Sequence, residues 1–175
     1  MKKILAIPTV IIVAMIIAYN VNSEYQAKQM MAKYDQIFYE SFGRYPDVIT
    51  TSSRGDSVDL SGLAEVMSNY NNEKYDAALG DFNEYLSANP DDHRITFYRG
   101  VVRLQLKQTD EAISDLKTVT ENYEDLKGQA EWYLALAYIK SNQADKAVPL
   151  LDAIVARDRG EHSKMSKTVL EQINS

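Results

Sequence analysis

Cysteine is absent from the 175 residues of the sequence, and glycine and proline are scarce, with seven and four copies. Without cysteine the chain has no disulfide framework, no thiolate nucleophile and no cysteine-bound metal site. The seven glycines are scattered, so the sequence holds no glycine-rich phosphate-binding loop. A shortage of both residues also means few helix breaks, which is typical of a mostly helical chain.

Histidine is also scarce, and the net charge is negative. The two histidines, His93 and His162, have no metal-ligating or nucleophilic partner at a recognised spacing. The formal net charge is −6 and the isoelectric point lies near 5.0, whereas nucleic-acid binders usually carry a basic face. We therefore expect no enzymatic activity, no cofactor, no metal and no nucleic-acid partner.

The N-terminus carries the one long uncharged run. Lys2 and Lys3 precede fifteen residues without charge, and extending this run through Val21 gives eighteen. A membrane-spanning helix needs about 20 apolar residues, and the core of a signal peptide has about 7–15. We favour an uncleaved signal anchor that comprises residues 1–21, because helix formers follow it without a break. A signal peptide cleaved near Ser23 and a buried core helix are the alternatives.

The two lysines also predict an orientation, because basic residues next to a span are retained in the cytoplasm. We expect a single-pass protein of the inner (cytoplasmic) membrane, held through residues 4–21. Its N-terminus would be cytoplasmic and its body periplasmic or otherwise extracytoplasmic.

Residues 22–42 have the apolar spacing of an amphipathic stalk helix. Its aromatic stripe is Tyr34, Phe38 and Phe42. The stripe either docks on a partner or a second copy, which would allow homo-oligomers, or packs on the chain's own first repeat. Gly43 and Pro46 then end the helix, and residues 43–59 are expected to be a polar linker.

Three similar stretches follow, with aligned alanines at Ala78, Ala112 and Ala147, which are 112 − 78 = 34 and 147 − 112 = 35 residues apart. This period indicates a helical solenoid. The expected units are residues 60–90, 91–124 and 125–159, with Asp91 and Thr109 as helix N-caps. Residues 160–175 are expected to form a C-terminal capping helix.

The small residues Gly100 and Ala135 in the first helices, and the large apolar Phe82, Leu116 and Leu151 in the second, complete the pattern. With these residues the chain resembles the tetratricopeptide-repeat (TPR) family. The resemblance implies an all-α fold, a right-handed α-solenoid of three TPR helix pairs plus the capping helix, preceded by the transmembrane and stalk helix. In layout the chain is also similar to single-span periplasmic TPR proteins.

The resemblance further implies that the first helices of the units line a groove that binds a partner protein. Mapped onto this sequence, the groove positions are Leu63, Met67, Arg94, Phe97, Val101, Gln129, Trp132 and Leu136. Separately, Arg99, Arg103 and Lys107 form a basic stripe on one helix face. This stripe either meets a carboxylate-rich partner or pairs with acids of a neighbouring helix, such as Asp81 or Glu84.

These features together predict a membrane-tethered, non-catalytic adaptor or scaffold that acts outside the cytoplasm and binds a membrane-complex subunit or an exported client through its groove. One alternative is a constitutive accessory subunit of an inner-membrane complex, held by its transmembrane and stalk helix. A second alternative is a cleaved, soluble periplasmic TPR binding module.

Overall fold

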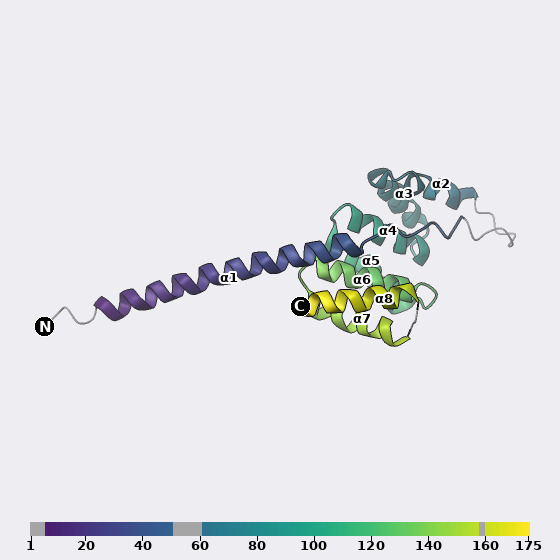
Figure 1. The fold of residues 1–175 in the computed structure, drawn as a ribbon. Helices are drawn as coiled ribbons and strands as arrows, with labels where there is room; N and C mark the ends of the chain where they lie inside the picture. Colours follow the sequence, from purple (N-terminus) through teal and green to yellow (C-terminus); the bar gives the residue numbers. More distant parts are fainter. Residues whose placement is uncertain (1–5, 51–60, 158–159) are drawn as a thin grey trace.

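The computed structural model describes residues 6–50, 61–157 and 160–175, and within these ranges it is all-α, with eight helices and no strand (Figure 1). The predicted all-α class is thus confirmed for the described residues. The helices are α1 (Ala6–Ser41), α2 (Ser61–Asn71), α3 (Tyr75–Ala88), α4 (His93–Gln105), α5 (Thr109–Asn122), α6 (Lys127–Lys140), α7 (Ala144–Arg157) and α8 (Glu161–Asn174).

Helices α2 to α7 form three helix pairs that stack in sequence order, and α8 packs on α7 at the end of the stack. The turn inside each pair contains one non-glycine residue with positive φ: Glu73 (59°), Lys107 (63°) and Asn142 (60°). These residues are 107 − 73 = 34 and 142 − 107 = 35 positions apart, which is the period of the aligned alanines. The three pairs therefore share one backbone turn.

The hydrogen bonds of these turns show why the left-handed residue is needed. The N–H of Lys107 donates to the carbonyl of Leu104 (3.1 Å), and that of Gln108 donates to Arg103 (2.8 Å). The other two turns repeat this pattern. It satisfies carbonyls that the end of a helix leaves without a partner.

Two of the expected helix caps differ from the structure. Asp92, not Asp91, caps α4, and its side chain accepts hydrogen bonds from the N–H groups of Arg94 and Ile95. Gln108 is the N-cap of α5 and makes no side-chain cap bond, so Thr109 is instead the first residue of that helix.

The two helices of the second pair approach closely at Gly100. A Cβ atom placed there would lie 2.9 Å from Cγ of Leu116 and 3.3 Å from Cβ of Asp115. Both distances are shorter than an ordinary van der Waals contact. The small residue predicted at this position is therefore required by the packing of α4 on α5.

Helix α1 has two sections with different surroundings. At 36 residues it is about 54 Å long, and it projects from the helix stack as a rod (Figure 1). Residues 11–32 are all exposed, whereas Ile37 and Phe38 are buried where α1 packs on α6 and α8. We call residues 11–32 the arm.

No helix in the described ranges is both long enough and apolar enough to cross a membrane. The membrane-spanning segment expected over residues 1–21 is therefore not found there. Tyr19, Asn20 and Asn22 end the apolar run of the described arm. Residues 1–5 of the expected segment lie outside the described part of the chain.

Candidate functional site

The predicted groove residues lie on α2, α4 and α6, the first helices of the three pairs, which share one face where the rings of Tyr70, Tyr98, Phe97 and Tyr133 contact one another in turn. We call this the inner face. Six of the eight are buried: Leu63, Met67, Phe97, Val101, Trp132 and Leu136. Arg94 and Gln129 are partly exposed, and Arg94 pairs with the cap residue Asp92 at 3.1 Å. In this structure the inner face is therefore not an open groove.

The C-terminal end of α1 covers the third pair. Phe38 stacks on Phe42, with ring centroids 5.0 Å apart, and Phe42 meets Tyr133 of α6 edge-on at 5.9 Å. Lys140 on α6 pairs with Asp35 of α1 at 2.7 Å. The aromatic stripe expected on the stalk helix thus packs on the chain itself, but on the third helix pair instead of the first.

The C-terminal helix also holds α1. The Lys33 ammonium donates to the carbonyl of Ile173 (3.2 Å), and the Gln172 amide donates to the Glu40 carboxylate (3.0 Å). Val169 of α8 is buried in the hydrophobic core. Helix α8 therefore caps α7 and supports the base of the arm at once.

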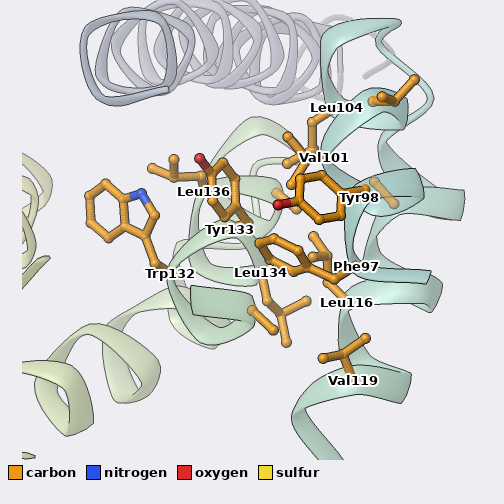
Figure 2. Packing of buried hydrophobic residues seen from close by; sticks show 14 of the residues in the cluster. Phe97, Tyr98, Val101, Leu104, Leu116, Val119, Trp132, Tyr133, Leu134 and Leu136 are labelled. Atoms are coloured by element: carbon orange, nitrogen blue, oxygen red, sulfur yellow. The ribbon is translucent and has the colours of Figure 1, made fainter. Parts of the chain in front are cut away.

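Residues 43–50 run along the inner face, whereas the sequence predicted that they form the first part of a polar linker. The remainder of that expected linker, residues 51–59, lies outside the described residues. We call residues 43–50 the strap. Tyr45 of the strap meets Phe97 edge-on at 5.0 Å and lies 6.2 Å from the Tyr133 ring. Figure 2 shows Phe97, Tyr98 and Tyr133 gathered between α4 and α6, while Trp132 points away from them.

Three tyrosines of the inner face, one from each helix pair, donate hydrogen bonds to carbonyls of the strap. Tyr133 of α6 bonds to Gly43 at 2.7 Å, Tyr70 of α2 to Tyr45 at 2.5 Å, and Tyr98 of α4 to Pro46 at 2.8 Å. The Tyr98 hydroxyl also accepts from the N–H of Val48 at 2.9 Å. The tyrosines thus bind the backbone of the strap.

Burial raises the pKa of Tyr70, Tyr98 and Tyr133 well above the usual value for a phenol. The three hydroxyls therefore remain protonated across the physiological range, and each can donate a hydrogen bond to a carbonyl.

Asp47 fixes the far end of the strap. Its carboxylate accepts from the side chain of Asn71 (2.7 Å) and from the N–H groups of Ile49 and Thr50 (both 3.0 Å). Burial alone would raise the pKa of Asp47, but the hydrogen bonds from Thr50 and Asn71 outweigh it and hold the pKa below its usual value. Asp47 therefore stays ionised at neutral pH and ties the strap to α2.

The predicted basic stripe meets an acid that was not expected. Arg99 and Arg103 both pair with Asp115 of α5, at 2.7 and 2.6 Å, and this aspartate is buried. Asp81 instead accepts a hydrogen bond from Asn69. The two arginines therefore join α4 to α5 and are not presented as a basic binding surface.

Both histidines pack against aromatic rings. His93 bonds to Asp125 through Nε2 (2.8 Å) and stacks on Tyr123, while His162 stacks on Trp132 at 5.7 Å. Among the described residues no group of three or more histidine, aspartate or glutamate side chains is placed to hold a metal ion.

The stacked helix pairs with one recurring turn agree with a comparison against protein-family models. A model described as tetratricopeptide repeat matches residues 63–126 and 107–162, more than half of the chain. The chain belongs to the tetratricopeptide-repeat family. A comparison with curated protein sequences found no match. TPR domains bind other proteins, so the family supports a protein-interaction scaffold and a protein partner.

The strap is the part of this TPR protein that sequence reasoning missed. Its composition resembles that of a linker because it contains glycine, proline and charged residues. One signal was available: Tyr98 and Tyr133 are 133 − 98 = 35 positions apart, the same spacing as Ala112 and Ala147. A tyrosine that recurs at the period of the repeats indicates that the hydroxyl groups bond to one common segment. It does not say which segment that is.

Proposed function

We propose that this TPR protein is a non-catalytic scaffold tethered to a membrane by its N-terminal arm, with the repeats on the extracytoplasmic side. In this function the repeats bind a partner protein and the arm keeps the complex at the membrane surface. Lys2 and Lys3 support the orientation, because basic residues next to a membrane segment are retained in the cytoplasm. The orientation requires the chain to cross the membrane within residues 4–21, of which residues 4 and 5 lie outside the described part of the chain.

One observation carries the proposal: residues 11–17, at the start of the arm, expose apolar side chains on every side. Ile11, Ile12, Val13, Met15, Ile16 and Ile17 are each 51–60% exposed. Because consecutive residues of a helix point in all directions, these side chains leave no polar face. A helix that is apolar all round is expected to be buried, either in a large core or in lipid.

The free energy at stake is enough to hold the protein on a bilayer. Burial of one such side chain contributes about 1.5–3 kcal/mol. The six side chains are about half exposed, so covering them would contribute on the order of 5–10 kcal/mol. A single myristoyl chain, which gives reversible binding, supplies an association constant of about 10⁴ M⁻¹, or roughly 5.5 kcal/mol. The free energy from covering these side chains thus matches or exceeds the binding free energy of one lipid anchor.

The same exposure also favours a second candidate, an accessory subunit of a membrane complex. In that case helices of another subunit cover the arm, and the repeats are held in place through it. The two candidates differ in what the arm contributes to partner binding. A scaffold with a polar arm should still capture its partner in solution, whereas an accessory subunit should lose it.

Membrane fractionation tests the tether. We expect the wild-type chain to float with membranes and the double variant Ile12→Glu, Ile16→Glu to remain soluble, because two charges cannot enter the hydrocarbon layer cheaply. Gln26→Glu with Gln29→Glu is the matched control, since it adds the same charges to the polar section of the same helix. Flotation of both double variants like wild type would refute the tether.

Protease added to right-side-out membrane vesicles tests the orientation. If the repeats lie outside the cytoplasm, the protease digests them without detergent. Repeats that are degraded only after detergent opens the vesicles would contradict the proposed side of the membrane.

A further inference from the structure

The strap lies on the inner face as an extended peptide lies on a receptor. Exposure alternates from Arg44 to Asp47: Arg44 and Pro46 are exposed, whereas Tyr45 is partly buried and Asp47 is buried. Val48 is partly buried, and a turn at Ile49 and Thr50 follows. Alternation with a period of two is the mark of an extended chain with one side on a surface. Over residues 44–47 the strap is therefore extended, with Tyr45 and Asp47 toward the helices. The exposed Arg44 also reaches the inner face, with its guanidinium 5.4 Å from the centroid of the Tyr70 ring.

The contacts divide into two kinds with different roles. The four hydrogen bonds between the strap backbone and Tyr70, Tyr98 and Tyr133 involve no strap side chain, so any extended peptide could make them. The side-chain contacts are selective. An aromatic ring fills the site beside Phe97, and a carboxylate two residues later meets Asn71.

The strap can also leave without breaking the helices that hold it. The backbone hydrogen bonds of α2, α4 and α6 close within each helix. Departure of the strap therefore breaks side-chain contacts, and it frees hydroxyl groups that can bond to water or to another carbonyl. Segments held in this way open locally at a lower free energy than the helical core.

We propose that the strap is an intramolecular ligand of the inner face and that a partner protein binds there by exchange with it. The partner would present an extended segment with an aromatic residue and, two positions later, an acidic residue, as Tyr45 and Asp47 do. This inference rests on the partner-binding part of the proposed function. It does not involve the membrane, so its test uses the full chain in mild detergent.

Hydrogen exchange of the wild-type protein gives the first test. The N–H of Val48, bonded to Tyr98, should exchange at least about 100-fold faster than the slowest amides of α5, because the strap opens without global unfolding. Equal exchange of Val48 and α5 would mean that the strap opens only when the protein unfolds, and it would overturn the proposal.

Peptide binding gives the second test, with a fluorescent synthetic peptide of residues 43–50 as the probe. The wild-type chain should bind it weakly, because the attached strap competes at an effective concentration on the order of millimolar. Tyr45→Ala weakens the attached strap and leaves the receptor intact, so it should tighten binding by at least about tenfold. Adding Tyr98→Phe should reverse this gain, because it removes the hydrogen bond that Tyr98 donates to the strap backbone.

The controls distinguish replacement of the strap by the peptide from a general loosening of the fold. Tyr39→Ala truncates an exposed tyrosine outside the strap and should leave peptide binding at the wild-type level. If Tyr45→Ala fails to fold, Asp47→Asn is the milder variant that replaces it. Peptide binding that does not tighten in a folded strap variant overturns the proposal. Because Tyr45 is far from the arm, that outcome would leave the membrane tether standing.

Discussion

The buried carboxylate of Asp115 is the best single position at which to test the packing of the second repeat. It pairs with two arginines of α4 and accepts three short hydrogen bonds, from Nε (2.9 Å) and Nη2 (2.7 Å) of Arg99 and from Nη1 of Arg103 (2.6 Å). Asp115→Asn keeps the shape of the side chain but removes the charge. It also places an amide against one of the guanidinium groups.

The expected loss follows from the exposure of the three groups. Removing one member of a fully buried ion pair costs about 3–5 kcal/mol. Here the carboxylate is 6% exposed, but the arginine side chains are 21% and 17% exposed, so water can reach them in part. We therefore expect a loss of about 2–3 kcal/mol in the free energy of unfolding, which lowers the melting temperature by roughly 10 °C.

Urea unfolding of the full chain in mild detergent measures this loss. The single tryptophan, Trp132, is buried and reports unfolding through its fluorescence. Asp152→Asn, at an exposed site on α7, is the matched control and should change stability by less than about 0.5 kcal/mol. Combining Asp115→Asn with Arg103→Met should cost less than the sum of the two single losses, because one of the two arginine charges that Asp115→Asn leaves uncompensated is removed. A loss below about 1 kcal/mol for Asp115→Asn would refute the reasoning.

Three further predictions use the same unfolding assay. Phe38→Ala should cost about 3 kcal/mol because this ring is buried against the repeats, whereas Tyr39→Ala should cost under about 1 kcal/mol; equal losses would contradict the docking of α1. Gly100→Ala should destabilise the protein by about 1–2 kcal/mol, because the clash with Leu116 costs more than the gain of up to about 1 kcal/mol in helix propensity. A stabilised variant would show that α5 shifts to make room for the added methyl group. Asp92→Ala should lose the cap of α4, about 1–2 kcal/mol. Burial raises the folded-state pKa of Asp92, but hydrogen bonding outweighs it and lowers that pKa. The difference in free energy of unfolding between the variant and wild type should therefore be full above about pH 5 and shrink as the pH falls through that pKa. A constant difference down to about pH 2 would argue against this.

Much of the architecture can be predicted from local residue patterns. The spacing of Ala78, Ala112 and Ala147 predicts three helix pairs, and the structure places left-handed turn residues at the same spacing. Gly100 predicts a close helix contact, which the structure contains. These features depend on contacts within one repeat or between neighbouring repeats, so each is encoded by residues close together in the sequence.

The partners of the basic stripe were harder to predict. Arg99 and Arg103 share a helix face, but a one-dimensional pattern does not say which acid of the neighbouring helices lies opposite. Asp81 lies on the helix before α4 and Asp115 on the helix after it, so either could pair with the arginines. The choice of Asp115 depends on how α4 and α5 approach each other at Gly100, which is a property of the packed pair.

The sequence by itself determined the repeat architecture and the apolar N-terminal run. Only the tertiary structure decided what covers the inner face. The groove residues Phe97 and Trp132 are apolar whether a partner, a neighbouring repeat or the strap buries them, so their identity cannot distinguish these occupants. The strap reaches Tyr133 from Gly43, 90 positions away in the chain. A contact of that range depends on the path of the whole chain, and no local pattern contains it.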